Sequence, residues 1–308
     1  MRRELLAKGL RVGVTGGAEV VSGLDLTLRA GEMLALVGES GCGKSAAAAA
    51  LGGILPPGLE PRGGTVAWED GSPVRRGEGI AYVFQEPASA FNPVLTVGFQ
   101  IAEAMRGVPK REAREKGLSL LRDVELGEAA ERVWKSYPME LSGGQLQRAF
   151  IAMALASGPA VLVADEPTTA LDVTVQRAVL RLLRRACTAG TAVLLITHNL
   201  GVVALAADRL CVMYAGRAVE SGPVAEVLRA PRHPYVAALL AAVPRLSADA
   251  GTLQGIPGRV PPPEARGAGC TFAPRCPQAK PECFETAPAF VADGARAVAC
   301  HAAATLRG

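Results

Sequence analysis

The sequence predicts an α/β fold with a largely parallel sheet, and three short apolar segments are the main reason. Residues 33–37, 160–164 and 192–196 are unbroken apolar runs, as in strands that are buried on both faces of a sheet. Segments with a helical pattern lie between these runs, and strands that alternate with helices favour a parallel sheet. Polar residues follow the second and third runs directly, at the strand ends where open α/β sheets bind ligands.

Two further patterns place elements before and after the first of these strands. Leu24, Leu26 and Leu28 alternate with polar residues, which predicts a strand with one buried face. The alanine-rich segment 45–55 predicts a helix that ends at the Pro-Pro pair after it.

The rest of the chain suggests an insertion and an extension. Residues of about 86–150 are richer in charge and have a helical pattern, for example over 111–123, so we expect a helical insertion there. Beyond Pro231, proline and glycine become more frequent and a group of cysteines begins. The predicted organisation is therefore a core domain of residues 1–232 and a C-terminal extension of residues 233–308.

Composition and charge narrow the class of protein. The chain has 308 residues, 49% of them apolar, so it can form a sizeable core. Its net charge of +4 is mild and its basic residues form no long run, so a nucleic-acid partner is not indicated. No apolar run reaches the ~18 residues of a membrane span, and no apolar segment follows the basic start. We therefore expect a cytoplasmic chain whose role at a membrane depends on partners.

A glycine-rich loop, GESGCGKS at residues 38–45, fits the pattern G-x-x-x-x-G-K-[ST] in full and lies between a buried strand and a helix. In such a loop the backbone N–H groups and the positive helix end bind phosphate oxygens. The pattern predicts a P-loop NTPase in which Lys44 reaches the β- and γ-phosphates and the Ser45 hydroxyl binds Mg²⁺. The residues expected to contact the nucleotide are Gly38, Glu39, Ser40, Gly41, Cys42, Gly43, Lys44, Ser45 and Ala46.

Cys42 lies inside this loop, close to the start of the predicted helix. The favoured interpretation is that Cys42 is a small spacer residue. The alternative hypothesis is a thiol that reacts when the site is empty, because a helix N-terminus lowers the pKa of a nearby thiol.

A second glycine motif identifies the branch of phosphate-loop proteins. Residues 141–145, LSGGQ, resemble the signature of ABC ATPases, and they precede the Asp165 strand as in that family. Backbone N–H groups at a helix N-terminus can hold a γ-phosphate. The resemblance implies a head-to-tail dimer, an antiparallel β-arm and a helical subdomain. It also implies contacts with the ATP of the opposite subunit by Ser142, Gly143, Gly144 and Gln145.

The catalytic groups follow from the same resemblance. The segment VLVADE at residues 161–166 is similar to Walker B, in which Asp165 holds Mg²⁺ and Glu166 is the general base that polarises the attacking water. The segment FQEP at residues 84–87 is similar to the Q-loop, which implies that Gln85 touches Mg²⁺ or its water and that its loop faces the membrane partner.

Two more family positions complete the expected ATP site. The segment TTALD at residues 168–172 is similar to the D-loop, which implies that Asp172 communicates across the dimer. His198, directly after a buried strand, resembles the switch histidine that contacts the γ-phosphate and helps to fix the water. Lys44, Gln85, Glu166 and His198 are thus the expected catalytic residues, with ATP and Mg²⁺ as ligands.

One expected feature of the family is missing. ABC ATPases usually stack adenine on an aromatic residue of the N-terminal arm, and alignment by eye places Val14 there. Stacking on an aromatic ring is worth ~1–3 kcal/mol per base. We therefore predict weak ATP affinity and poor discrimination between ATP and GTP.

Several segments are similar to the oligopeptide/dipeptide importer branch, which also includes nickel importers. They are FNPVLTVG at 91–98, ALDVTVQ at 170–176, HPY at 233–235, GIPG at 255–258 and CTFAPRCP at 270–277. Val94 and the Thr168-Thr169 pair resemble the first, D-type, ATPase of that branch.

The resemblance to this branch implies a set of partners. They are two membrane-spanning permease subunits, a second related ATPase and, indirectly, an extracytoplasmic binding protein. It also implies a peripheral position at the cytoplasmic face of the cell membrane. The substrate is expected to be an oligopeptide or dipeptide, with nickel or another small solute as the alternative.

Four cysteines gather near the C-terminus, and in a reducing cytosol such a group suggests metal binding more than disulfides. Cys270, Cys276, Cys283 and Cys300 are spaced more widely than the ligands of common zinc sites. Four thiolates can hold a [4Fe–4S] cluster, and some relatives are thought to do so. A cluster, a zinc ion and free buried thiols all stay open.

Other functions fit the sequence less well. A soluble ABC ATPase that acts on DNA or ribosomes tends to have long coiled coils or two ATPase domains, and neither pattern is present. A small-molecule phosphotransferase has no use for LSGGQ. A non-catalytic subunit is disfavoured by the intact Lys44, Asp165, Glu166 and His198.

Overall fold

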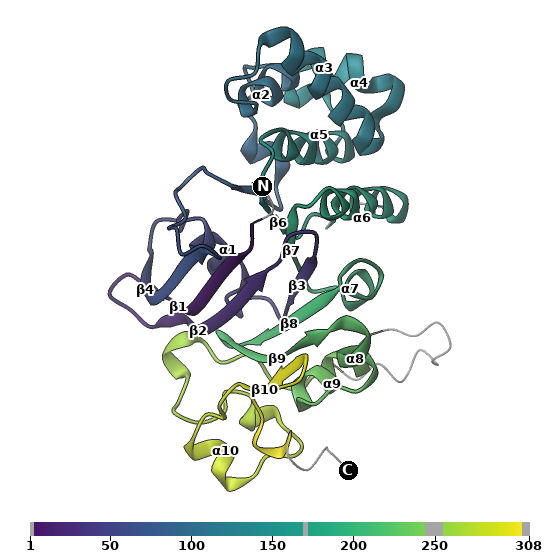
Figure 1. The fold of residues 1–308 in the computed structure, drawn as a ribbon. Helices are drawn as coiled ribbons and strands as arrows, with labels where there is room; N and C mark the ends of the chain where they lie inside the picture. The colour runs from purple at the N-terminus through teal and green to yellow at the C-terminus, as the bar shows by residue number, and fades with distance from the viewer. Residues whose placement is uncertain (1–2, 169–171, 244–254, 304–308) are drawn as a thin grey trace. The chain divides into compact units, whose positions relative to one another are not determined.

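A computed structural model describes residues 3–168, 172–243 and 255–303 (Figure 1). Within these ranges no helix combines the length and the apolar character needed to cross a membrane.

The chain divides into two compact units that interleave along the sequence. The first unit is made of residues 1–5, 28–33 and 74–196. The second unit is made of residues 6–27, 34–73 and 197–308.

The first unit contains three parallel strands, β5 (Ile80–Val83), β6 (Val161–Asp165) and β7 (Ala192–Thr197). Strands β6 and β7 coincide with two of the apolar runs in the sequence and are buried almost throughout. Val83 is in register with Ala164, and Asp165 with Ile196. The carboxyl ends of these strands therefore meet at one edge.

The helices of the first unit follow β5 in the sequence. They are η1 (Pro87–Ala90), α2 (Val97–Ala104), α3 (Lys110–Leu121), η2 (Arg122–Leu126), η3 (Gly127–Ala129), α4 (Ala130–Lys135), η4 (Pro138–Glu140), α5 (Gly143–Ala156) and α6 (Val173–Thr188). Helices α2 and α6 begin at side-chain caps, in which Thr96 accepts from the N–H of Phe99 and Asp172 accepts from the N–H groups of Thr174 and Val175.

The second unit contains two groups of strands. A three-stranded sheet has the order β2 (Glu19–Leu28), β1 (Leu5–Val14), β4 (Leu59–Trp68). A further group has the order β10 (Val291–Asp293), β11 (Arg296–Val298), β9 (Arg217–Pro223), β8 (Arg209–Tyr214), β3 (Met33–Val37). β3 is parallel to β8, whereas β9, β10 and β11 pair antiparallel with their neighbours in this group.

Helix α1 (Lys44–Leu51) is shorter than the sequence pattern predicts. It ends at Gly52 rather than at the Pro-Pro pair, and Gly53 has a positive φ of 65°. The N–H groups of Gly53 and Ile54 close the last turn on the carbonyls of Ala50 and Ala49. Glycine is the usual residue for such a termination, so the two glycines end the helix before the prolines are reached.

The C-terminal extension joins the second unit through strand pairing. It follows α7 (Leu200–Ala206) and α8 (Val224–Arg229) and contains α9 (Pro234–Ala241), η5 (Pro263–Ala265), η6 (Ala273–Arg275) and α10 (Pro281–Glu285). Its strand β11 pairs with β9, with Val298 opposite Glu220. The fully buried Glu220 accepts hydrogen bonds from Arg296 and from the backbone of Arg232 and His233. A buried carboxylate needs such donors, so this contact fixes the extension to β9.

Candidate functional site

The phosphate loop, residues 38–45, connects β3 to α1 as the sequence predicts. Gly38 is needed because a Cβ there would lie 2.3 Å from the carbonyl oxygen of Met213 and 2.7 Å from the sulfur of Cys42. Gly43, which precedes α1, has a φ of 105°, a conformation that other residues rarely adopt. The loop thus folds tightly against β8 and presents the first turn of α1 to its interior.

Lys44 lies across this loop and is 8% exposed. Its ammonium donates hydrogen bonds to the carbonyl oxygens of Gly38 at 2.8 Å and Glu39 at 3.0 Å. The positive charge is therefore held over the hollow of the loop, where it can meet an anion that also contacts the N-terminus of α1. Ser40, Gly41 and Ser45 are exposed, so the predicted phosphate contacts are accessible.

The structure supports the spacer interpretation of Cys42 and disfavours the hypothesis of a reactive thiol. Its side chain is fully buried, with its sulfur 3.8 Å from the Lys44 ammonium. Burial raises the pKa of the thiol and outweighs the opposite effect of the lysine charge. Cys42 fills the space beneath the loop, which is the spacer role.

Val14, where the family usually has an aromatic residue, ends β1 and is 38% exposed. Arg62 of β4 donates hydrogen bonds from its Nη2 to the carbonyl oxygens of Val14 at 2.9 Å and Gly17 at 3.3 Å. Its Nε lies 2.8 Å from a carboxylate oxygen of Glu60. This end of the arm therefore carries an aliphatic side chain and an arginine, and no aromatic ring lies among the residues before Trp68.

In the first unit, Gln85, Asp165 and Glu166 lie at or just beyond the carboxyl ends of neighbouring strands. Gln85 follows β5 and is exposed, Asp165 ends β6, and Glu166 comes directly after it. Glu166 has a φ of 50°, which is rare for a residue with a side chain, and its N–H donates to the Ile196 carbonyl at 3.0 Å. Such strain is found at functional sites, where the surrounding structure holds an unfavourable backbone in place.

The signature segment, residues 141–145, precedes and begins α5 in the same unit. Ser142 and Gln145 form a capping box, because the Ser142 side chain accepts from the Gln145 N–H and the Gln145 side chain accepts from the Ser142 N–H. Ser142 and Gly143 are exposed, and a Cβ on Gly143 would meet nothing within 4 Å. The segment is thus an open helix N-terminus with room for a ligand.

The remaining predicted residues are placed as follows. Asp172 is the N-cap of α6, and Thr168 is buried, whereas residues 169–171 of the predicted D-loop lie outside the described residues. His198 follows β7 directly and is exposed. Gln85, Asp165, Glu166 and the signature segment belong to the first unit, and the phosphate loop and His198 to the second.

The four C-terminal cysteines come together although they are far apart in the sequence. Cys270, Cys276, Cys283 and Cys300 line one cavity of about 20 Å³, with His233 and His301 among its other lining residues. Burial raises the thiol pKa of Cys270, Cys276 and Cys300. Among the described residues, however, no three potential ligands converge as a single metal ion requires.

Two side chains at the phosphate loop were not expected from the sequence. The Tyr235 hydroxyl accepts from the N–H of Glu39 at 3.0 Å, and Arg275 Nη1 lies 3.1 Å from the Glu39 carboxylate. Both residues come from the C-terminal extension. Their motifs indicate a family branch, but no local pattern in the sequence indicates contact with a loop about 200 residues earlier.

Comparison with protein families finds three matches along the chain, one of them to an AAA domain model over residues 135–204. Residues 21–169 match the model of the ABC transporter family, and residues 219–283 match the oligopeptide/dipeptide transporter C-terminal region. The oligopeptide transport ATP-binding protein AppD of Bacillus subtilis is 42% identical, covering 88% of this chain and 87% of AppD. OppD of Mycobacterium tuberculosis is 48% identical, covering 87% of this chain and 46% of OppD.

Solved structures give the same result. A dimeric bacterial ABC transporter cassette is 27% identical, with a TM-score of 0.62, and covers 71% of this chain and 98% of the cassette. The same cassette in a post-hydrolysis state bound to ADP and phosphate has a TM-score of 0.63 at 27% identity, with the same coverage of both chains. The predicted phosphate-loop α/β fold is thereby confirmed.

Proposed function

The chain belongs to the ABC transporter family as an ATP-hydrolysing subunit of the peptide-import branch, and we propose that it drives uptake of oligopeptides or dipeptides. The observation that carries this proposal is the oligopeptide/dipeptide C-terminal region, which matches residues 219–283 and is folded onto the phosphate-loop unit. Relatives named for oligopeptide transport match 87–88% of this chain, which supports the choice of substrate class.

The ATP chemistry is assigned to residues at the strand ends. Lys44 binds the β- and γ-phosphates, and the exposed His198 contacts the γ-phosphate. Glu166, held in its strained conformation, accepts a proton from the attacking water. Oxygen atoms of Ser45, Gln85 and Asp165 suit Mg²⁺, which neutralises phosphate charge when bound.

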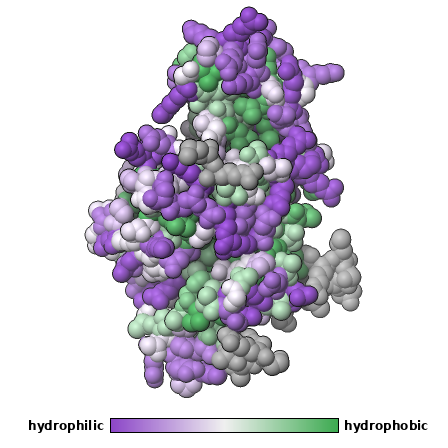
Figure 2. All heavy atoms as spheres, viewed as in Figure 1, coloured by the Kyte–Doolittle hydropathy of each residue, from purple (hydrophilic) through white to green (hydrophobic). Residues whose placement is uncertain are grey.

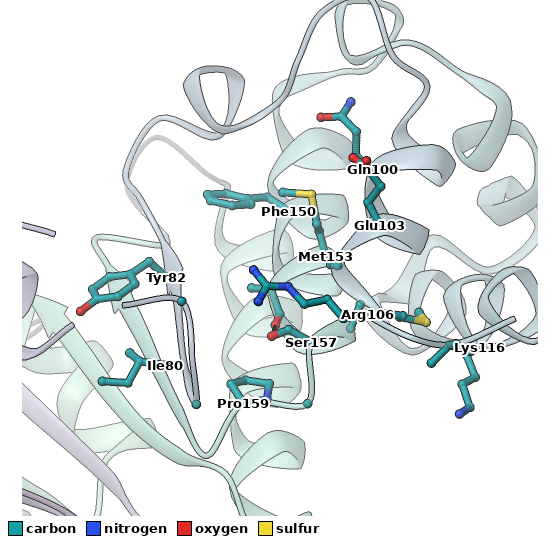
Figure 3. Close-up of a pocket in the computed structure, with 18 of the residues that line it drawn as sticks. Ile80, Tyr82, Gln100, Glu103, Arg106, Lys116, Phe150, Met153, Ser157 and Pro159 are labelled. Atoms are coloured by element: carbon teal, nitrogen blue, oxygen red, sulfur yellow. Dashed lines mark hydrogen bonds between the residues drawn. The ribbon is translucent and has the colours of Figure 1, made fainter. Parts of the chain in front are cut away.

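A groove in the first unit is proposed as the docking site for a permease subunit. It has a volume of about 820 Å³ and lies between β5 and the helices α2 and α5 (Figure 3). Tyr82, Phe150 and Met153 form an apolar wall, while Glu103 and Arg106 are charged groups from the end of α2. Hydrophobic atoms are visible around α5 on the face shown in Figure 2.

The groove suits a short amphipathic segment of a membrane protein, because it offers apolar surface with charges beside it. Tyr82 is on β5, and Gln85 follows that strand. Docking at the groove can therefore shift the Q-loop, which links the permease to the nucleotide site. Phe84, Val94 and Phe99 are also exposed in this unit and extend its apolar surface.

We propose two permease subunits, a second related ATPase and an extracytoplasmic binding protein as the partners, with this chain at the cytoplasmic membrane face. The second ATPase is supported by the open signature segment, which has room for a nucleotide held elsewhere, and by the dimeric cassette among the similar structures.

Co-purification from native membranes tests this proposal. The tagged wild-type chain should recover two membrane-spanning subunits and a second ATPase, and the complex should hydrolyse ATP faster when its binding protein is loaded with peptide.

Arg106→Glu, which changes the charge in the groove, should reduce recovery of the membrane-spanning subunits. Arg111→Glu makes the same change on a side chain that is 93% exposed outside the groove and should not reduce recovery. Recovery with ribosomes or DNA proteins, or stimulation only by nickel, would overturn the peptide-import proposal.

A [4Fe–4S] cluster is proposed for the four cysteines. Convergence on one cavity supports it, and a cluster binds each thiolate through a different iron, so the sulfurs need not meet at one point as around zinc. The cavity is close to the size of one water molecule, so these segments must open to admit a cluster. Iron and acid-labile sulfide in the anaerobically purified chain, lost in Cys276→Ser, would support it, and an iron-free chain would refute it.

A further inference from the structure

One arginine of the C-terminal extension forms an ion pair with the phosphate loop. The Arg275 side chain is 6% exposed, and its Nη1 lies 3.1 Å and 3.2 Å from the two carboxylate oxygens of Glu39. Glu39 is the second residue of the loop, 236 positions earlier in the sequence. An ion pair so well shielded from water is screened little by salt.

The guanidinium of Arg275 is fixed on every side. Its Nη1 also donates to the Tyr214 hydroxyl at 3.1 Å, its Nε to the Pro257 carbonyl at 2.7 Å, and its Nη2 to the Ile256 carbonyl at 3.2 Å. The planar group also lies over the Tyr214 ring, 5.7 Å from the centroid. Because these acceptors hold the arginine in a single position, Arg275 can impose that position on Glu39.

Glu39 is held at its backbone as well. Its N–H donates to the Tyr235 hydroxyl at 3.0 Å, and its carbonyl accepts from the Lys44 ammonium at 3.0 Å. Tyr235 is buried against Tyr214, with ring centroids 4.7 Å apart. Glu39 thus connects the extension directly to the lysine that faces the phosphates.

The charge of Glu39 explains why such a partner is needed. A carboxylate in a loop that binds triphosphate repels its ligand, and the side chain is only 28% exposed, so water screens this repulsion incompletely. The arginine offsets the charge of the carboxylate and holds it in one position. A second arginine of the extension, Arg266, donates to the carbonyls of Glu19 and Val20, next to the loop residue Gly43.

We propose that Arg275 is a positioning residue for ATP binding, and that the cysteine-bearing extension is part of the nucleotide site rather than an appendage. Arg275 directly precedes Cys276, which lines the cysteine cavity. A change of structure at that cavity therefore moves the arginine that holds Glu39. This inference rests on the proposed function only in that the loop binds ATP.

The test measures MgATP dissociation constants of the full chain with a fluorescent ATP analogue. Arg275→Met should weaken binding about tenfold or more, because the Glu39 charge is released toward the phosphates. Adding Glu39→Gln to Arg275→Met should restore affinity to within about threefold of the wild type, since no repelling charge then remains. Arg275→Lys, which keeps the charge without the fork of donors, should show an intermediate loss.

Arg232→Met is the matched control. Arg232 also belongs to an ion pair with the extension, 3.0 Å from Asp293, but it does not touch the loop. It should leave MgATP affinity unchanged.

Unchanged MgATP affinity in Arg275→Met would overturn the proposal, and so would a loss of affinity that Glu39→Gln does not restore. Arg275 would then have only a structural role. If Arg275→Met does not fold, the MgATP affinities of Arg275→Lys alone and of Arg275→Lys with Glu39→Gln are compared instead, and the second should be the higher. Failure of the wild-type chain to bind ATP would instead contradict the proposed function.

Discussion

The two glycine loops that are expected to contact ATP are built in opposite ways. The phosphate loop is held by residues from far along its own chain, since Tyr235 and Arg275 both bind Glu39. The signature segment is held from within its own helix, by its capping box and by Arg148, which donates to the Gly144 carbonyl at 3.0 Å, and its serine and first glycine are exposed. A loop that is held from several sides is complete in one chain, whereas an open loop is suited to a ligand that arrives with another chain. The predictions below test this difference.

The largest effect is expected at the strained Glu166. Glu166→Gln removes the base but leaves the phosphate loop intact, so ATP should still bind while turnover falls ~10²–10⁴-fold. Steady-state phosphate release and nucleotide retention measure the two properties. Glu128→Gln, an exposed surface change, serves as control. Turnover within about twofold of the wild type would show that another group is the base.

The contrast between the loops predicts a separation of binding from turnover. Lys44→Ala removes a charged hydrogen-bond donor worth ~1.5–3 kcal/mol of binding free energy, so the isolated chain should bind ATP roughly 10–150-fold more weakly.

Gly143→Asp adds a negative charge where a γ-phosphate from another subunit is expected, and the open space around Gly143 accepts the side chain. It should leave ATP affinity of the isolated chain unchanged and lower turnover of the assembled complex. Weaker binding by the isolated Gly143→Asp chain would show that the signature segment acts within one chain.

The arm residue Val14 offers a gain of affinity. Val14→Tyr supplies the missing ring at a position that is already exposed, and stacking of adenine is worth ~1–3 kcal/mol, about 5–150-fold in affinity. Titration with ATP and GTP measures both affinity and discrimination. Val94→Tyr, an equally conservative change at an exposed residue of the other unit, should have no effect. No gain in Val14→Tyr would mean that adenine does not stack at this end of the arm.

The smallest effect concerns pH. Burial lowers the pKa of His233 from 6.5 to about 4, and its Nδ1 accepts from the Tyr235 N–H at the start of α9. The unfolded chain binds a proton at higher pH than the folded one, so this contribution to stability is complete above pH 6.5 and is lost as pH falls toward 4.

Urea unfolding at pH 7 and pH 5 measures this loss. His233→Asn keeps a side chain that can cap the helix but cannot take up a proton. The urea midpoint of this variant should therefore change less between pH 7 and pH 5 than the midpoint of the wild type. An equal change in both proteins would assign the pH dependence to other groups.

Local patterns were sufficient for the elements that carry the ATP motifs. Buried strands have continuous apolar runs, so β3, β6 and β7 could be predicted closely, and GESGCGKS gave the position of the phosphate loop. Helix α1 was predicted too long because prolines were weighed above the Gly52-Gly53 pair. For Cys42 the sequence left a reactive thiol as an alternative, because the burial that raises the thiol pKa is not visible in a local pattern.

Contacts between distant segments could not be predicted. Arg275 and Tyr235 lie in motifs that indicate a family branch, but no local pattern predicts that the folded extension brings both of them to Glu39. The same holds for the cysteines, whose spacing suggested a common site without giving its geometry. The roles of the catalytic residues rest on family motifs, and the mutations above test them.

Peptide uptake tests most directly whether ATP hydrolysis by this chain drives import. Cells or proteoliposomes with the complete complex should accumulate a labelled short peptide when this chain is wild type. Accumulation should stop with Glu166→Gln, although the complex still assembles. Continued accumulation with Glu166→Gln, or none with the wild-type complex, would contradict the conclusion that ATP hydrolysis by this chain drives peptide import.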